Sequence, residues 1–197
     1  MTDTELLMIV RHGDSDSGEN ARLTEAGGKQ MDALYGVIDT VINDIYGEKT
    51  PPKRLLFSFS KLPRAIQSIG KLAHPFRNED IILMDLYCTE RKDIIEPQKI
   101  VEKVLGLSSY YEALVSVVVA HGEMPAVIAE TAHEMVTGKK IKEFPYPQNA
   151  HGFVVNMTTG AILKIHPKFL EEYEAHKKAD AAAGDIVASL APWACVL

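Results

Sequence analysis

The 197-residue sequence is poor in cysteine, has no excess of basic side chains and contains no long apolar segment. Its two cysteines, Cys88 and Cys195, lie far apart and form no CxxC pair, so the sequence indicates neither a disulfide framework nor a cysteine metal site. A reducing cytoplasm is therefore the expected compartment. The net charge of −6 argues against broad nucleic-acid binding, because that activity requires a basic face. An acidic chain can still hold a local basic pocket for a phosphorylated ligand.

Long apolar segments are missing throughout the chain. No apolar run approaches the roughly 20 residues that a membrane helix needs. At the amino terminus, Asp3 and Glu5 precede only a short apolar run, which is unlike the basic start and longer apolar region of a secretory signal. We therefore expect no membrane association. A length of 197 residues suits one domain over residues 1–197 with a single core, and the sequence leaves the oligomeric state open.

Strand and helix patterns alternate along most of the chain. Short continuous apolar runs predict buried strands at residues 6–10, 55–59, 81–84 and 114–120. Helical patterns begin at Thr24 and about Pro63 and cover residues 97–105, 125–137 and 167–178, and the runs 153–157 and 161–165 predict a hairpin. Thr24 and Ser60 are expected to cap their helices, with Pro63 in a first turn. The alternation predicts an α/β fold, a three-layer sandwich with a mostly parallel central sheet.

Basic side chains follow three of the predicted strands at the point where each strand ends. Arg11 and His12 come directly after the first strand, and His121 comes directly after the strand at 114–120. Arg64 lies in the opening turn of the helix that follows the strand at 55–59. Open α/β sheets bind ligands at the edge where the carboxyl ends of their parallel strands meet, so we expect these side chains to gather there.

Two arginines and two histidines at one sheet edge suit phosphoryl transfer. Planar guanidinium groups hold phosphoryl oxygens with paired hydrogen bonds, and stabilisation of this kind needs no metal ion. His12 is the candidate nucleophile, which must attack through an unprotonated ring nitrogen while a hydrogen bond fixes the other nitrogen. The leaving group then needs a proton. Glu90, in the loop after the third strand, is the candidate acid, and Asp85 is its competitor.

Four motifs occur in an order that resembles a known family. They are Arg11-His12-Gly13, Leu23-Thr24-Glu25-Ala26-Gly27, the segment from Ser58 through Arg64-Ala65-Ile66-Gln67-Ser68, and Val119-Ala120-His121-Gly122. Together they resemble the histidine phosphatase superfamily, which includes the cofactor-dependent phosphoglycerate mutases. Within this superfamily the sequence is most similar to the small bacterial phosphohistidine phosphatases, because the interval between His12 and Leu23 is short and there is no large inserted cap.

The resemblance implies a phosphoglycerate mutase-like fold and a metal-independent phosphatase without a cofactor. His12 would be phosphorylated during turnover, and Arg11, Arg64 and His121 would form the phosphate pocket with the backbone amide of Gly122. The substrate would be a phosphohistidine protein or a small phosphorylated molecule. Mutase-like members place a glutamate after the third strand, whereas the small phosphohistidine phosphatases can lack it. Two alternatives stay open: a phosphoglycerate-type mutase and a non-catalytic phosphoryl-binding regulatory module.

Overall fold

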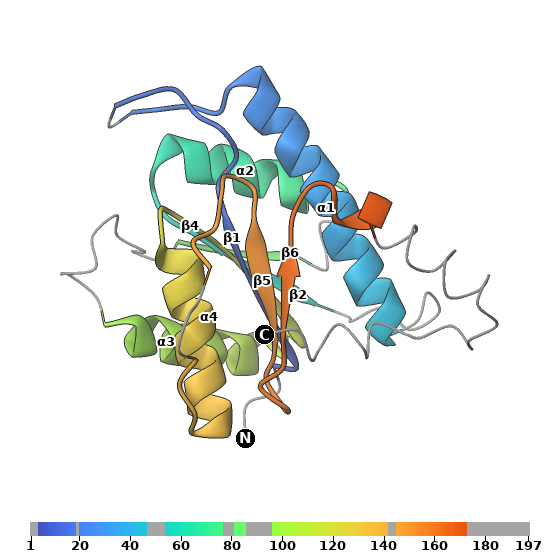
Figure 1. The fold of residues 1–197 in the computed structure, drawn as a ribbon, viewed down its shortest axis with the longest axis vertical. Coiled ribbons are helices and arrows are strands. Elements are labelled where there is room, and N and C mark those ends of the chain that lie inside the picture. Colours follow the sequence, from blue (N-terminus) through green and yellow to red (C-terminus); the bar gives the residue numbers. More distant parts are fainter. Residues whose placement is uncertain are drawn as a thin grey trace.

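A six-stranded mixed sheet forms the centre of the described part of the chain (Figure 1). This computed structural model describes residues 4–18, 20–46, 54–76, 81–85, 96–141 and 145–172. The strands are β1 (Leu6–Arg11), β2 (Leu55–Phe59), β3 (Ile81–Asp85), β4 (Val115–Ala120), β5 (Gly152–Asn156) and β6 (Ile162–Ile165). Their order across the sheet is β3-β2-β4-β1-β5-β6. The strands β3, β2, β4 and β1 are parallel, and β5 is antiparallel to both of its neighbours.

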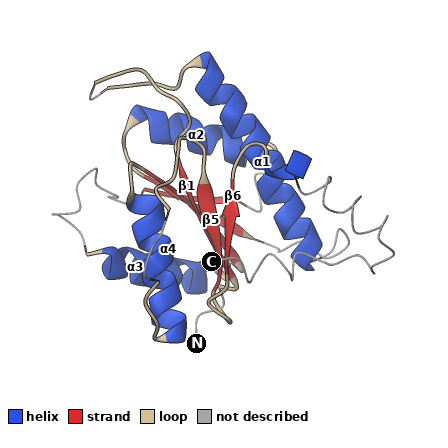
Figure 2. Cartoon of the chain, in the orientation of Figure 1, coloured by secondary structure: helices blue, strands red, loops and turns tan. Residues whose placement is uncertain are grey.

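Helices cover both faces of the sheet, which gives three layers (Figure 2). α1 (Glu25–Tyr46) and α2 (Pro63–Ala73) pack on one face, and α3 (Pro97–Tyr111) and α4 (Met124–Thr137) pack on the other. Alternate residues of β1 enter the two cores: Met8 packs with α1 and α2, and Ile9 packs with α3 and α4. Burial on both faces explains why β1 is an unbroken apolar run. The predicted α/β sandwich with a mostly parallel sheet is confirmed.

The start of α1 follows the predicted capping pattern, and the start of α2 does not. Thr24 caps α1 as expected, because its Oγ1 accepts the Gly27 N–H over 3.0 Å. Ser60 does not cap α2, and this prediction was wrong. The N-cap of α2 is Leu62, which makes no side-chain capping bond, and the Ser60 hydroxyl instead hydrogen-bonds the ring of His121.

α3 is longer than the periodicity predicts. It continues beyond residue 105 to Tyr111, and in this last part Ser108 is buried and donates its hydroxyl to the Val104 carbonyl in the preceding turn. Residues 169–172 are helical, and the rest of the helix predicted over 167–178 lies outside the described residues. Among the helices that the structure describes, none has the length and apolar character needed to cross a bilayer.

Candidate active site

The register of the sheet brings the two histidines together. β1 and β4 are parallel neighbours with Arg11 opposite Ala120, so the next residue of each strand leaves the same edge at the same level. The His12 N–H donates to the Ala120 carbonyl over 3.2 Å, and the His12 and His121 rings lie 5.0 Å apart between centroids. β2 is the other neighbour of β4, and the helix that follows it brings Arg64 to this edge.

His12 is buried in a protonation state that suits nucleophilic attack. Its Nδ1 lies 2.7 Å from the Gly13 carbonyl oxygen, which can only accept, so Nδ1 carries the proton and Nε2 carries the lone pair. Burial lowers the pKa of His12 to about 4, and the guanidinium groups of Arg64 and Arg11 act in the same direction against the opposing Gly13 bond. The imidazole is therefore neutral at neutral pH.

His121 is buried beside His12 with both ring nitrogens in contact with polar partners. The Arg64 Nε–H donates to its Nδ1 over 3.3 Å, so the neutral ring carries its proton on Nε2 and donates it to the Ser60 hydroxyl oxygen. That oxygen also accepts the Leu62 N–H over 3.4 Å. Burial lowers the pKa of His121 to about 3, and His12 and both arginines add to the effect. His121 is thus a neutral, oriented ring and a poor acid near pH 7.

Arg11 presents a donor that has no acceptor among the described residues. Its Nη1 donates to the Pro147 carbonyl over 3.0 Å, which holds the guanidinium at the sheet edge. The Tyr146 ring lies 5.5 Å from the guanidinium carbon, measured to the ring centroid. The Nε of Arg11 is buried and without a hydrogen-bond partner in the described part of the chain. A bound oxyanion would supply the acceptor that this donor lacks.

Gly122 and Tyr146 complete this side of the site. Gly122 has a φ of 53°, a left-handed conformation that a side chain would strain. A Cβ at Gly122 would lie 3.7 Å from the Tyr146 hydroxyl oxygen, so the Tyr146 ring extends from Arg11 to the turn that follows β4. Tyr146 is 60% exposed, which leaves its outer face open to a bound molecule.

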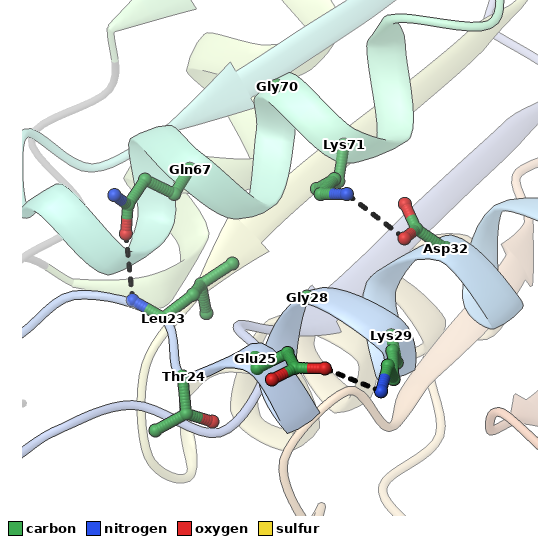
Figure 3. A pocket seen from close by; sticks show the side chains of 9 residues that line it. All are labelled: Leu23, Thr24, Glu25, Gly28, Lys29, Asp32, Gln67, Gly70 and Lys71. Atoms are coloured by element: carbon green, nitrogen blue, oxygen red, sulfur yellow. Dashed lines mark hydrogen bonds and ion pairs between the residues drawn. The ribbon is translucent and has the colours of Figure 1, made fainter.

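Polar contacts fix the loop that follows His12. Asp14 accepts from Gln30 Nε2 over 2.8 Å and from the Asn149 side-chain amide, which ties the loop to α1 and to the segment before β5. Further along, the Leu23 N–H donates to Gln67 Oε1 over 2.7 Å, a bond drawn in Figure 3. These contacts hold the backbone on both sides of the loop, so His12 projects from a rigid frame.

A pocket of about 560 Å³ lies between the start of α1 and α2, away from the two histidines (Figure 3). Lys71 and Asp32 form an ion pair of 3.0 Å across it, and Lys29 pairs with Glu25 over 2.7 Å within α1. Its walls share no residue with the pair of histidines or their arginines. We assign it no role in phosphoryl chemistry.

The described part of the chain does not identify the general acid. Glu90 lies outside the described residues. Asp85 is the last residue of β3 and pairs in register with Phe59 of β2, so its backbone is at the same edge of the sheet as the histidines. The acid therefore stays a prediction. Among the described residues, no group of three histidine, cysteine, aspartate or glutamate side chains could hold a metal ion.

Two residues of this arrangement, Ser60 and Tyr146, are not predicted as site residues from the sequence. Ser60 directly follows β2 at the correct edge, but its position before Pro63 pointed to a helix cap instead. Tyr146 lies in an irregular segment before β5, where neither periodicity nor spacing marks it. The position of Ser60 after a strand could have revealed it, whereas the sequence contains no signal for Tyr146.

Comparison with known proteins identifies the fold. No protein-family model and no curated protein sequence matches the chain. A structure named as the phosphohistidine phosphatase SixA from Nakamurella multipartitia matches with a TM-score of 0.52 and 15% identity, covering 83% of this chain and 96% of that one. Phosphoserine phosphatase from Entamoeba histolytica, in complex with 3-phosphoglyceric acid, matches with a TM-score of 0.50 and 14% identity, covering 81% and 94%. The chain shares the fold of these two structures.

The shared fold confirms the architecture that the resemblance of the four sequence motifs implies. At 14–15% identity the likeness establishes the fold alone. The roles of individual residues therefore depend on the geometry described above, in which His12, His121 and Arg64 are mutual neighbours and Arg11 acts electrostatically on both rings.

The low pKa values of the two histidines predict a specific pH dependence. We expect both rings to stay neutral in the folded protein down to about pH 5, because burial holds the pKa of His12 at about 4 and that of His121 at about 3. In the unfolded chain both would titrate near 6.5. Between these values the unfolded state binds protons that the folded state does not, so the free energy of unfolding falls as the pH drops below 6.5. For His12 the loss by pH 4 is roughly 3 kcal/mol.

Ring NMR signals followed from pH 8 to pH 4 would measure the titration, and urea unfolding across the same range would measure the stability. The urea-unfolded protein is the internal reference, in which the same rings should titrate normally. A His12→Gln variant should lose its share of the pH-dependent stability. A folded-state titration of His12 near pH 6.5 would contradict the burial argument.

Proposed function

We propose that this protein is a metal-independent phosphatase that forms a phosphohistidine intermediate on His12. The observation that carries the proposal is the state of that ring, which is buried, neutral and oriented by the Gly13 carbonyl, with Arg64 and Arg11 acting on it electrostatically. Two structures with the same fold are named as phosphatases, which supports a hydrolase of phosphate esters or phosphoramidates. The substrate is a phosphohistidine protein or a small phosphorylated molecule.

The first chemical step transfers the phosphoryl group to His12. The Nε2 lone pair attacks phosphorus, and the bond from phosphorus to the leaving group breaks with its electron pair on the leaving atom. The leaving atom takes a proton from an acid, for which Glu90 is the proposed residue and Asp85 the alternative. The proton stays on Nδ1 and is donated in a hydrogen bond to the Gly13 carbonyl, which stabilises the positive charge that develops on the ring.

The second step returns the enzyme to its starting state. Water attacks the phosphorus of the intermediate, the P–N bond breaks, and its electron pair returns to Nε2 of His12. The carboxylate formed in the first step accepts the proton of the attacking water. Inorganic phosphate is the product of this step, and the acid and His12 are both regenerated.

Four groups are proposed to hold the phosphoryl oxygens. Arg11 offers its buried Nε–H, and Arg64 offers guanidinium donors beside His121. His121 donates its Nε2 proton to Ser60 and accepts from Arg64 at Nδ1, so it would bind a phosphoryl oxygen by exchanging the Ser60 bond, and the amide of Gly122 follows it in the turn after β4. The arginine donors and the Gly122 amide would stabilise the charge of the transition state directly.

Rapid chemical quenching with ³²P-labelled phosphoramidate tests this proposal. Its ammonia leaving group departs readily, so the assay does not depend on the identity of the acid. We expect a protein-bound label that is labile in acid, stable in alkali and located on His12 by peptide mapping. The label should form before phosphate is released and should then decay to phosphate. Turnover with no histidine label would exclude the intermediate, and tight phosphate binding without turnover would favour the regulatory module instead.

A further inference from the structure

Tyr146 is an exposed aromatic side chain that a constrained backbone holds at the candidate active site. A proline stands on each side of it, and each proline ring fixes its own φ. The Pro147 carbonyl accepts Arg11 Nη1 over 3.0 Å, which ties the segment to the end of β1. A second bond repeats this link, because the Ala150 N–H donates to the His12 carbonyl over 3.0 Å. The backbone that carries Tyr146 is therefore fixed relative to the proposed nucleophile.

The Tyr146 side chain spans two of the groups proposed to hold the phosphoryl oxygens. Its ring centroid lies 5.5 Å from the guanidinium carbon of Arg11, within the range of a cation–π contact. At the far end of the ring, the hydroxyl oxygen lies 3.7 Å from the position that a Cβ on Gly122 would occupy. Because Gly122 has no side chain, its backbone is open to the hydroxyl. The hydroxyl thus lies beside the turn after β4, whose amide follows His121.

The Tyr146 hydroxyl is a donor that has no acceptor within the described part of the chain. The side chain is 60% exposed, and together with Arg11 it lines a pocket of about 780 Å³. Arg11 Nε is in the same state, since no acceptor for it is present among the described residues. Two donors from different elements therefore border one hollow at the end of β1, and the protein supplies an acceptor to neither.

A phenol hydroxyl suits this position chemically. It is a neutral donor, so it adds a hydrogen bond to a phosphoryl oxygen without adding a charge, and bonds from O–H donors to anionic oxygens are stronger than neutral ones. Asp14 also lines the pocket, and its carboxylate keeps its negative charge because its partners there are the neutral amides of Gln30 and Asn149. A phosphoryl group is repelled from the Asp14 side. The donors of Arg11 and Tyr146 therefore lie where its oxygens are best accommodated.

We propose that Tyr146 is a further catalytic residue, whose hydroxyl donates a hydrogen bond to a non-bridging oxygen of the phosphoryl group held by Arg11 and Gly122. This inference rests on the proposed phosphatase function. The phosphoryl group moves from the leaving atom to Nε2 of His12 and then to water, while the hydroxyl keeps its own proton throughout. The same donor therefore acts in both chemical steps and also holds the product phosphate.

Tyr146→Phe tests the proposal, because it removes the hydroxyl and keeps the ring. We expect it to lower kcat/KM for phosphoramidate by about ten-fold, the loss of one hydrogen bond to a charged oxygen. Inorganic phosphate, measured as a competitive inhibitor, should bind more weakly by a similar factor. The loss in kcat/KM should be the same for phenyl phosphate, because the non-bridging oxygens are common to both substrates. A much larger loss for phenyl phosphate would assign the hydroxyl to the leaving atom and overturn the proposal.

Tyr110→Phe makes the same chemical change on an exposed tyrosine near the end of α3, where the chain leads into the start of β4 rather than its carboxyl end. It should leave kcat/KM and phosphate inhibition unchanged, and both variants should keep the wild-type urea midpoint because both side chains are exposed. If Tyr146→Phe hydrolyses phosphoramidate and binds phosphate as the wild type does, the role of the hydroxyl is wrong and the phosphatase stands. If the wild type hydrolyses no phosphoryl substrate, both proposals are wrong.

Discussion

Replacing His12 by asparagine is expected to lower turnover by about 10⁴-fold or more, because the variant has no atom that can form the phosphoryl-enzyme bond. The asparagine amide can still donate to the Gly13 carbonyl, as Nδ1 of His12 does over 2.7 Å. The substitution therefore removes the nucleophilic Nε2 while it keeps a local hydrogen bond. Steady-state phosphate release measures the loss, and the ³²P label described above should disappear from the variant.

His133 provides a control that is matched in chemistry and distant in function. It is partly buried, and its Nδ1, like that of His12, lies 2.7 Å from a backbone carbonyl, here that of Gly160. It belongs to α4 and contacts the hairpin between β5 and β6 rather than the sheet edge. His133→Asn should retain wild-type turnover in protein with an unchanged circular dichroism spectrum. If His12→Asn kept more than a small fraction of turnover, another residue would be the nucleophile.

The sequence alone predicts the parts of the site that follow buried strands. Residues 6–10 and 114–120 are so apolar that they must be central strands, and the polar residues after them must therefore lie at a sheet edge. What the sequence does not contain is the strand order. In the structure β4 lies between β1 and β2. Only this order, together with the register of Arg11 with Ala120, shows that the two histidines come into contact.

The remaining parts of the site come from irregular segments. Tyr146 belongs to the chain stretch before β5, whose position depends on the hairpin packing beside β1. No periodicity places such residues, because irregular backbone has no repeating side-chain direction. Ser60 shows a different difficulty: one residue can satisfy two local patterns, and the buried ring of His121 offers its hydroxyl a better partner than the helix start does.

Replacing Gly27 by alanine is expected to destabilise the protein by about 3 kcal/mol or more, because there is no space for a methyl group at that position. A Cβ on Gly27 would lie 2.0 Å from the carbonyl oxygen of Asp14 and 2.8 Å from its backbone nitrogen. That carbonyl also accepts the Thr24 N–H over 2.9 Å, so it cannot move without loss of a further bond. The mutation would force apart the start of α1 and the loop that carries His12. Urea unfolding at pH 7 measures the loss.

Gly28→Ala is the matched control, because it adds the same methyl group to the next residue of the same helix. The nearest atom to a Cβ at Gly28 is Lys71 Cε at 3.8 Å, which is ordinary contact. Alanine is favoured over glycine in a helix by up to about 1 kcal/mol, so this variant should be as stable as the wild type or more stable. Equal stability of the two variants would show that the loop does not depend on close backbone contact. A large difference would show that the contact between α1 and the loop after His12 depends on the absence of a side chain at Gly27, because Asp14 lies only two residues beyond the nucleophile.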